Sequence, residues 1–171
     1  AVHNIVFGAF SPDSLAERIN DSECKILITQ DNAFRGAKNN IPMKTNADEA
    51  GKNCPSIEHT IVVKRTGVEV PMVEPKDLWW DEITASEATT CEPEQMDAED
   101  ILFLLYTSGT TGKPKGVVHT TGGYLVGANN SMRTAFDLKD EDVFFCTEGI
   151  GWLTGHTYIV DGPFSACATA V

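Results

Sequence analysis

The sequence predicts an α/β fold. Short apolar runs rich in β-branched residues, each of strand length, alternate along the chain with segments whose apolar residues recur at helical spacing. The longest apolar run, Ile101 to Leu105, falls far short of the roughly 18 residues that span a bilayer, so no membrane partner is expected. With 171 residues and 42% hydrophobic content, the chain has the size and composition of a folded domain.

The chain is predicted to begin as a strand–helix–strand unit. His3 to Phe7 is apolar and β-branched, and reads as a strand. A helix follows, because Ser11 can cap free N–H groups and Pro12 suits the first helical position. Cys24 to Thr29 is a second short strand, and this spacing predicts that the two strands pair in parallel.

The remaining elements follow from the same criteria. The segment 30–42 is predicted to be a polar loop, and the acidic segment 88–100 a surface linker. Further strands are expected at 59–64, 101–106, 117–119, 143–146 and 166–171. Helices are expected at 46–53 with Asn46 as the cap, after Asp77 as the cap of LWWDEITAS, at 121–136 and at 156–160.

Charge is distributed unevenly along this acidic chain, whose formal net charge is −12. That balance argues against nucleic-acid binding, which needs clustered Lys and Arg. The segments 32–47 and 101–136 nevertheless contain no acidic residue, and each holds three basic ones. Such stretches either bind small anions, phosphates above all, or are solvated basic surface.

Five cysteines, at 24, 54, 91, 146 and 167, form no CxxC pair, and the histidines show no ligand spacing, so no metal site is predicted. Reduced thiols and the lack of a signal segment favour a cytoplasmic protein. Because both ends of the chain look cut, we expect a piece of a longer polypeptide.

The most informative segment is Tyr106 to Gly116, YTSGTTGKPKG, which directly follows the most apolar strand. Its glycines allow backbone N–H groups to converge on an anion, and its hydroxyls and lysines add hydrogen bonds. Ligands of open α/β sheets bind at the carboxyl ends of strands, so the position suits a polyphosphate. The loop is not a Walker A motif, because Gly109 and Gly112 are only three residues apart and Pro114 follows Lys113.

This loop resembles the signature loop of the adenylate-forming enzymes, which include acyl-CoA synthetases, luciferases and peptide-synthetase adenylation domains. The flanking sequences are similar to those of AMP-forming acetyl-CoA synthetases. They are SPDSLAERINDS at 11–22, FRGAKNNIPMK at 34–44, CPSIEHTIVVKRTG at 54–67, VVHTTGGYLVGA at 117–128 and GWLTGHTYIV at 151–160. The resemblance implies that residues 1–171 are an internal fragment of the large N-terminal, AMP-binding domain, without the C-terminal domain.

The resemblance also implies roles for individual residues. The ATP phosphates would be bound by Thr107, Ser108, Gly109, Thr110, Thr111, Gly112 and Lys113. CoA would be bound by Arg35, Gly36, Ala37, Lys38 and Thr154, and the acyl pocket would be bounded by Trp152 and Leu153. No residue of the fragment is a certain catalytic residue, and none is a metal ligand.

The implied reaction is acetate:CoA ligation, in which MgATP first converts acetate to acetyl-adenylate and CoA then displaces AMP. The substrates would be small molecules: acetate, ATP with Mg²⁺, and CoA. Two alternatives stay open. One is a propionyl-CoA or other short-chain acyl-CoA synthetase, and the other is a noncatalytic remnant that binds nucleotide or CoA.

Overall fold

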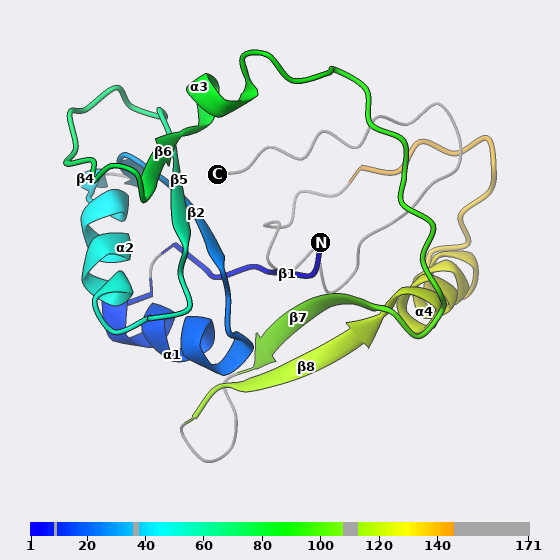
Figure 1. The fold of residues 1–171 in the computed structure, drawn as a ribbon. Helices are drawn as coiled ribbons and strands as arrows, with labels where there is room; N and C mark the ends of the chain where they lie inside the picture. The colour runs from blue at the N-terminus through cyan, green and yellow to red at the C-terminus, as the bar shows by residue number, and fades with distance from the viewer. Residues whose placement is uncertain (9, 36–37, 108–112, 146–171) are drawn as a thin grey trace. The chain divides into compact units, whose positions relative to one another are not determined.

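The computed structural model describes residues 1–8, 10–35, 38–107 and 113–145. The chain divides into two compact units, one formed by residues 8–93 and the other by residues 1–7 with 94–171. Helices and strands succeed one another along the chain in both units (Figure 1), which agrees with the predicted α/β class.

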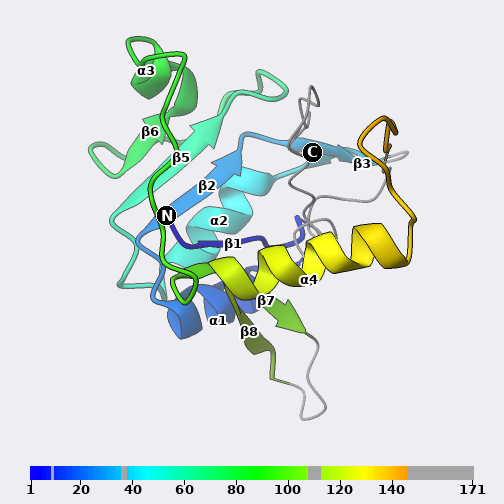
Figure 2. The same cartoon turned by 90° about the vertical axis from the view of Figure 1, so that its right-hand side faces the viewer.

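The unit of residues 8–93 is built on a parallel three-stranded sheet with strand order β2-β5-β6. Chain order runs from β2 through a β-hairpin and helix α2 to β5, which is the crossover that parallel pairing requires. Figure 2 shows the three strands side by side with α1 and α2 beside them. The elements are α1 (Pro12–Ser22), β2 (Ile26–Gln30), β3 (Ala33–Arg35), β4 (Lys38–Ile41), α2 (Met43–Gly51), β5 (His59–Val63), β6 (Asp77–Trp79) and α3 (Trp80–Thr84).

The core of this unit lies between the two helices and the sheet. Its buried members are Ala16, Ile19, Ala50, Cys54 and Ile57, and Leu27 of β2 packs against them. Side chains alternate along a strand, so Ile26 and Ile28 point to the opposite face of the sheet from Leu27. They are 55% and 59% exposed, which leaves that face apolar and uncovered within the unit.

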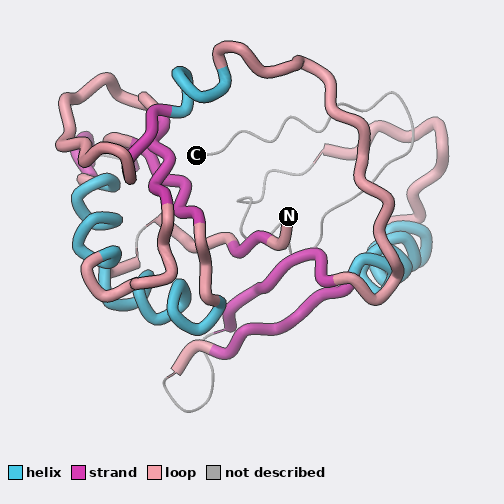
Figure 3. The backbone as a smooth tube through the Cα atoms, viewed as in Figure 1, coloured by secondary structure: helices cyan, strands magenta, loops and turns pink. Residues whose placement is uncertain are grey.

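The other unit contains β1 (His3–Asn4), β7 (Ile101–Thr107), β8 (Lys115–Thr120) and α4 (Thr121–Thr134). Its sheet has the order β1-β7-β8, with β1 parallel and β8 antiparallel to β7. Figure 3 shows β7 and β8 as adjacent strands and the segment before β7 as an extended loop. Residues 88–100 are all exposed and contain no helix or strand, which confirms the predicted surface linker.

The predicted helix start at Ser11 is confirmed, since its hydroxyl accepts a hydrogen bond from the Ser14 N–H at 3.3 Å. The predicted pairing of the first two strands is wrong. β1 pairs with β7 and β2 pairs with β5, because each strand finds a parallel partner across a longer connection. Pairing partners are set by tertiary packing, which local spacing does not reveal.

Four local predictions are also wrong. The segment 30–42 is a β-hairpin rather than a loop, since backbone pairing forms there despite its polar side chains. Helix α2 begins at Met43 after Pro42, not at a cap formed by Asn46. Asp77 lies in β6 and binds a buried lysine instead of capping a helix. Residues 143–145, the described part of the strand predicted at 143–146, are not in strand conformation, and Cys146 lies outside the described residues. The elements predicted at 156–160 and 166–171 lie outside the described residues.

Candidate functional site

The glycine-rich loop connects two strands that pair directly with each other. In the antiparallel register of β7 and β8, Thr107 lies opposite Lys115 and Tyr106 opposite Gly116. The loop therefore leaves the sheet at the carboxyl end of β7 and returns beside it, and its two ends are held together by the ladder. Residues 108–112, which include most of the predicted phosphate ligands, lie outside the described residues.

Gly116 has a specific role at the base of this loop. A Cβ atom at this position would meet the Tyr106 ring at 3.1 to 3.3 Å, which is tighter than ordinary van der Waals contact. The absence of a side chain lets the ring lie across the opposite strand. Glycine thus permits close packing of the strand pair at the point where the chain turns away from the sheet.

Four aromatic rings, from β1, β7, β8 and α4, pack together beside the two strands. Phe103 of β7 is 1% exposed and stacks on His119 of β8, with ring centroids 4.5 Å apart. Tyr124 of α4 contacts Phe103 edge-on at 4.9 Å, and His3 of β1 stacks on Phe103 at 5.5 Å. The cluster therefore joins both strands, the helix that follows them, and β1.

The described residues at the loop ends are exposed, and two of them are basic. Thr107, Lys113 and Lys115 are exposed, and the sequence from Ile101 to Phe136 contains no acidic residue. A pair of exposed ammonium groups beside glycines and hydroxyls attracts a polyanion. This is the charge that a triphosphate site requires.

A second basic turn occurs in the β3–β4 hairpin. Arg35 and Lys38 are opposite each other in its register, so the backbone places two basic residues at the last pair before the turn. Gly36 and Ala37, the residues between them, lie outside the described residues. Trp152, Leu153 and Thr154, predicted for the acyl pocket and for CoA, also lie outside them.

Asp31, at the entrance to this hairpin, is fully buried and accepts hydrogen bonds from five donors, four backbone N–H groups and one hydroxyl. Its carboxylate binds the N–H groups of Asn32 at 2.7 Å, Arg65 at 3.0 Å, Thr66 at 3.0 Å and Gly67 at 2.7 Å, and also the Thr66 hydroxyl. Burial acts to raise the pKa of Asp31, but these hydrogen bonds outweigh it and lower the pKa below its ordinary value.

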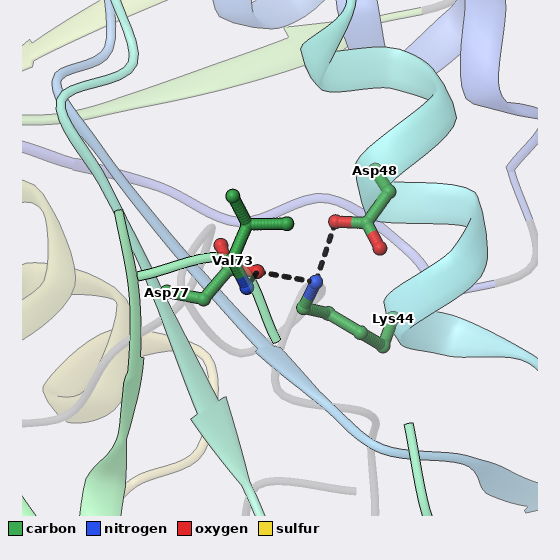
Figure 4. Close-up of polar contacts among 4 residues, drawn as sticks. All are labelled: Lys44, Asp48, Val73 and Asp77. Atoms are coloured by element: carbon green, nitrogen blue, oxygen red, sulfur yellow. Dashed lines mark hydrogen bonds and ion pairs between the residues drawn. The ribbon is translucent and has the colours of Figure 1, made fainter. Parts of the chain in front are cut away.

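Lys44, at the start of α2, forms a buried ion pair. Its side chain is 0% exposed, and Nζ lies 2.8 Å from Asp77 Oδ2 and 2.6 Å from Asp48 Oδ1 (Figure 4). Asp77 Oδ2 also accepts a hydrogen bond from the Val73 N–H at 2.9 Å. The charge of Lys44 is therefore compensated on both sides, and α2 is tied to β6.

Sequence reasoning did not single out Asp31 or Lys44. The partners that bury these groups, residues 65–67 for Asp31 and Asp77 for Lys44, lie about 34 residues away along the chain and give no local pattern. Two local signals were available for Lys44: Asp48 follows at i+4, and Lys44 falls in a segment without acidic residues, which indicated an anion ligand rather than an ion pair.

The sequence matches the AMP-binding enzyme family over residues 1–171. The chain belongs to this family. Its similarity to curated members of the AMP-binding family is high: it is 57% identical to the acetyl-coenzyme A synthetase of Rubrobacter xylanophilus and 56% identical to that of Nostoc linckia, each over all 171 residues. The chain spans 26% of the first protein and 50% of the second.

A solved structure of the same type supports the fold assignment. The acetoacetyl-CoA synthetase from Streptomyces lividans superimposes with a TM-score of 0.69 over 85% of this chain and 22% of that chain, at 31% identity. The α/β, adenylate-forming fold class is thereby confirmed. Among the described residues, no helix combines the length and apolar character that crossing a membrane needs, and no three candidate ligands gather to hold a metal ion.

Proposed function

We propose that this chain is part of an AMP-forming acetate:CoA ligase and forms an internal section of its N-terminal, AMP-binding domain. The observation that carries the proposal is the loop YTSGTTGKPKG, placed between paired strands and set within a chain that is 57% identical to an acetyl-coenzyme A synthetase. The free thiols at Cys24, Cys54 and Cys91 agree with a cytoplasmic location.

In the proposed reaction, an acetate oxygen attacks the α-phosphorus of ATP. The bond between the α-phosphorus and the oxygen that bridges the α- and β-phosphates breaks, and pyrophosphate is released. The CoA thiol then loses its proton and attacks the acetyl carbonyl carbon, and AMP leaves with the electron pair of the broken C–O bond. Both steps depend on positioning and on neutralising phosphate charge rather than on covalent participation of the protein.

The residues of this chain divide between the two steps. Thr107 to Lys113 would bind the β- and γ-phosphates, with hydroxyl and N–H donors from the loop and the ammonium of Lys113. Mg²⁺ would enter with ATP. Arg35 to Lys38 would bind the nucleotide phosphates of CoA, because a guanidinium suits phosphate geometry and an ammonium adds charge.

The acyl and thiol groups would meet beside the 152–154 segment. Trp152 and Leu153 would bound a short acyl pocket that admits acetate and rejects long chains, and Thr154 would contact the pantetheine arm of CoA. These roles in binding phosphate, CoA and the acyl group are proposed from the similarity to the adenylate-forming enzymes.

Two substitutions in the complete parent enzyme separate these roles. Lys113→Ala is expected to lower acetate-dependent ATP–pyrophosphate exchange about 100-fold, the usual effect of losing one charged donor to a reacting anion. Arg35→Ala is expected to raise the KM for CoA about tenfold and to leave the KM for ATP unchanged. The matched controls are Lys139→Ala and Arg133→Ala, which remove exposed basic residues outside both loops.

Unchanged exchange in Lys113→Ala would remove the lysine from the phosphate site. Equal effects of Arg35→Ala on CoA and ATP would contradict a CoA-specific role. Thioester formation measured with acetate and with propionate decides the substrate, and markedly faster use of propionate would favour a propionyl-CoA synthetase.

A further inference from the structure

The parallel sheet of residues 8–93 has one face that is covered by helices. Leu27, Thr60 and Asp77 are partners across β2, β5 and β6 and therefore share this face. Leu27 packs against the hydrophobic core, to which α1 and α2 contribute, and Asp77 binds Lys44 of α2 (Figure 2). Thr60 and Asp77 are buried accordingly.

The opposite face of the same sheet is apolar and open. Ile28, Ile61 and Leu78 are partners there and form a row across all three strands, because side chains alternate along a strand. Ile26 and Val63 lie on this face, one row to either side. Ile26 and Ile28 are 55% and 59% exposed, and the other three are half-buried, so no part of the chain that the structure describes buries any of them.

The strands have the composition of a sheet that is covered on both faces. Parallel sheets are buried on both sides, and their strands are apolar in both directions, whereas a sheet with one wet face alternates apolar and polar residues. β2 places Leu27 on the covered face and two isoleucines on the open one. β5 likewise places Val62 on the covered face, and Ile61 and Val63 on the open one.

The length of chain outside residues 1–171 indicates where the cover comes from. In the unit of residues 1–7 and 94–171, Tyr124 of α4 contacts Phe103 and Met132 is buried, and the exposed residues of α4 are glycine or polar except for Val126. The described helix of that unit therefore lacks a second apolar face. By contrast, about three-quarters of the Rubrobacter xylanophilus acetyl-coenzyme A synthetase lies outside the part that this chain matches.

We propose that the open sheet face formed by Ile26, Ile28, Ile61, Val63 and Leu78 is an interface that, in the complete parent enzyme, is covered by an apolar segment from outside residues 1–171. None of these five side chains carries a charge or a hydrogen-bonding group, so the segment that fits them is apolar. The inference rests on the part of the proposed function that makes this chain an internal section of a longer ligase.

The first measurement compares thiols placed on the two faces of the sheet in the complete parent enzyme. Ile28→Cys tests the open face, and Val62→Cys, at a position that is 0% exposed on the covered face, is the matched control. Maleimide labelling of each thiol is followed by mass spectrometry of its peptide. The Ile28→Cys thiol should react as slowly as the Val62→Cys thiol, about 100-fold or more below its rate in the unfolded enzyme. A rate closer to that of the unfolded enzyme would overturn the proposal.

The second measurement identifies the segment. A benzophenone-bearing amino acid replaces Ile28, or Ile26 if the first variant does not fold, and the cross-linked peptides are identified after irradiation. Cross-links to the same polypeptide outside residues 1–171 are expected. Cross-links to residues within 1–171, to a second copy of the enzyme, or to no peptide would each overturn the proposal. Thioester formation by the wild-type enzyme is measured separately, so failure of the proposed ligase activity is distinguished from failure of the interface.

Discussion

Replacing Asp31 by Asn removes one carboxylate oxygen from a buried site built entirely of hydrogen-bond donors. Oδ1 accepts from the N–H groups of Asn32, Arg65 and Thr66, and Oδ2 accepts from the N–H groups of Thr66 and Gly67 and from the Thr66 hydroxyl. Whichever oxygen becomes an amide nitrogen, its two hydrogens face at least two N–H groups that can only donate.

The loss of stability in Asp31→Asn can be estimated from the number of hydrogen bonds lost. A hydrogen bond to a charged group contributes about 1.5–3 kcal/mol, so losing two of them predicts a destabilisation of about 3–6 kcal/mol. Asp31 is 0% exposed, so solvent does not replace the lost partners. Native proteins are stable by about 5–15 kcal/mol, so the variant should retain its fold with a much smaller margin.

Amide hydrogen exchange measures this effect locally. Exchange of the N–H groups of Arg65, Thr66 and Gly67 should accelerate by about 100-fold or more, because each 1.4 kcal/mol corresponds to a factor of ten. The amide of Phe103, in the other unit, should be unaffected. The control is Asp81→Asn, which neutralises an exposed carboxylate. Exchange at residues 65–67 equal to wild type would refute the structural role assigned to Asp31.

The pH dependence provides an independent check. The pKa of Asp31 in the folded protein lies below its ordinary value of 3.8. Its ionised form therefore stabilises the fold fully above about pH 4, and this contribution is lost as the pH falls through the lower, folded-state pKa. The stability difference between wild type and Asp31→Asn should accordingly shrink on acidification. A difference that stays constant down to low pH would contradict the assignment.

Two further substitutions test packing and the buried ion pair. Gly122→Ala should destabilise the protein, because the new Cβ would lie 2.7 Å from Ala98 Cβ. Gly127→Ala, whose new Cβ would meet no atom within 4 Å in the described part of the chain, should instead stabilise α4 by up to about 1 kcal/mol. Thermal unfolding measures both effects, and equal changes in the Tm of the two variants would refute the clash at Gly122. Lys44→Met should cost about 3–5 kcal/mol in urea unfolding by leaving Asp77 without its cation, and adding Asp77→Leu should restore most of it. A double variant as unstable as the single one would show that packing, not charge, sets the cost.

Features that depend on neighbouring residues could be predicted from the amino-acid sequence. Ser11 and Pro12 start a helix because capping is a matter of adjacent residues, and Ile101–Thr107 forms a strand because its apolar run has no alternative. The glycine-rich loop was recognisable because its eleven residues are contiguous. These local signals were sufficient to predict the α/β class and the family resemblance.

Strand pairing and the burial of polar groups, in contrast, depend on tertiary packing. The hairpin at Ala33–Ile41 is polar and looked like a loop, since its strands are stabilised by backbone pairing and by the base around Asp31 rather than by apolar side chains. The sequence around Asp77 is compatible with a helix cap, but in the structure its carboxylate forms an ion pair with Lys44. Interactions between residues far apart in sequence leave no local pattern, so they become visible only in the three-dimensional structure.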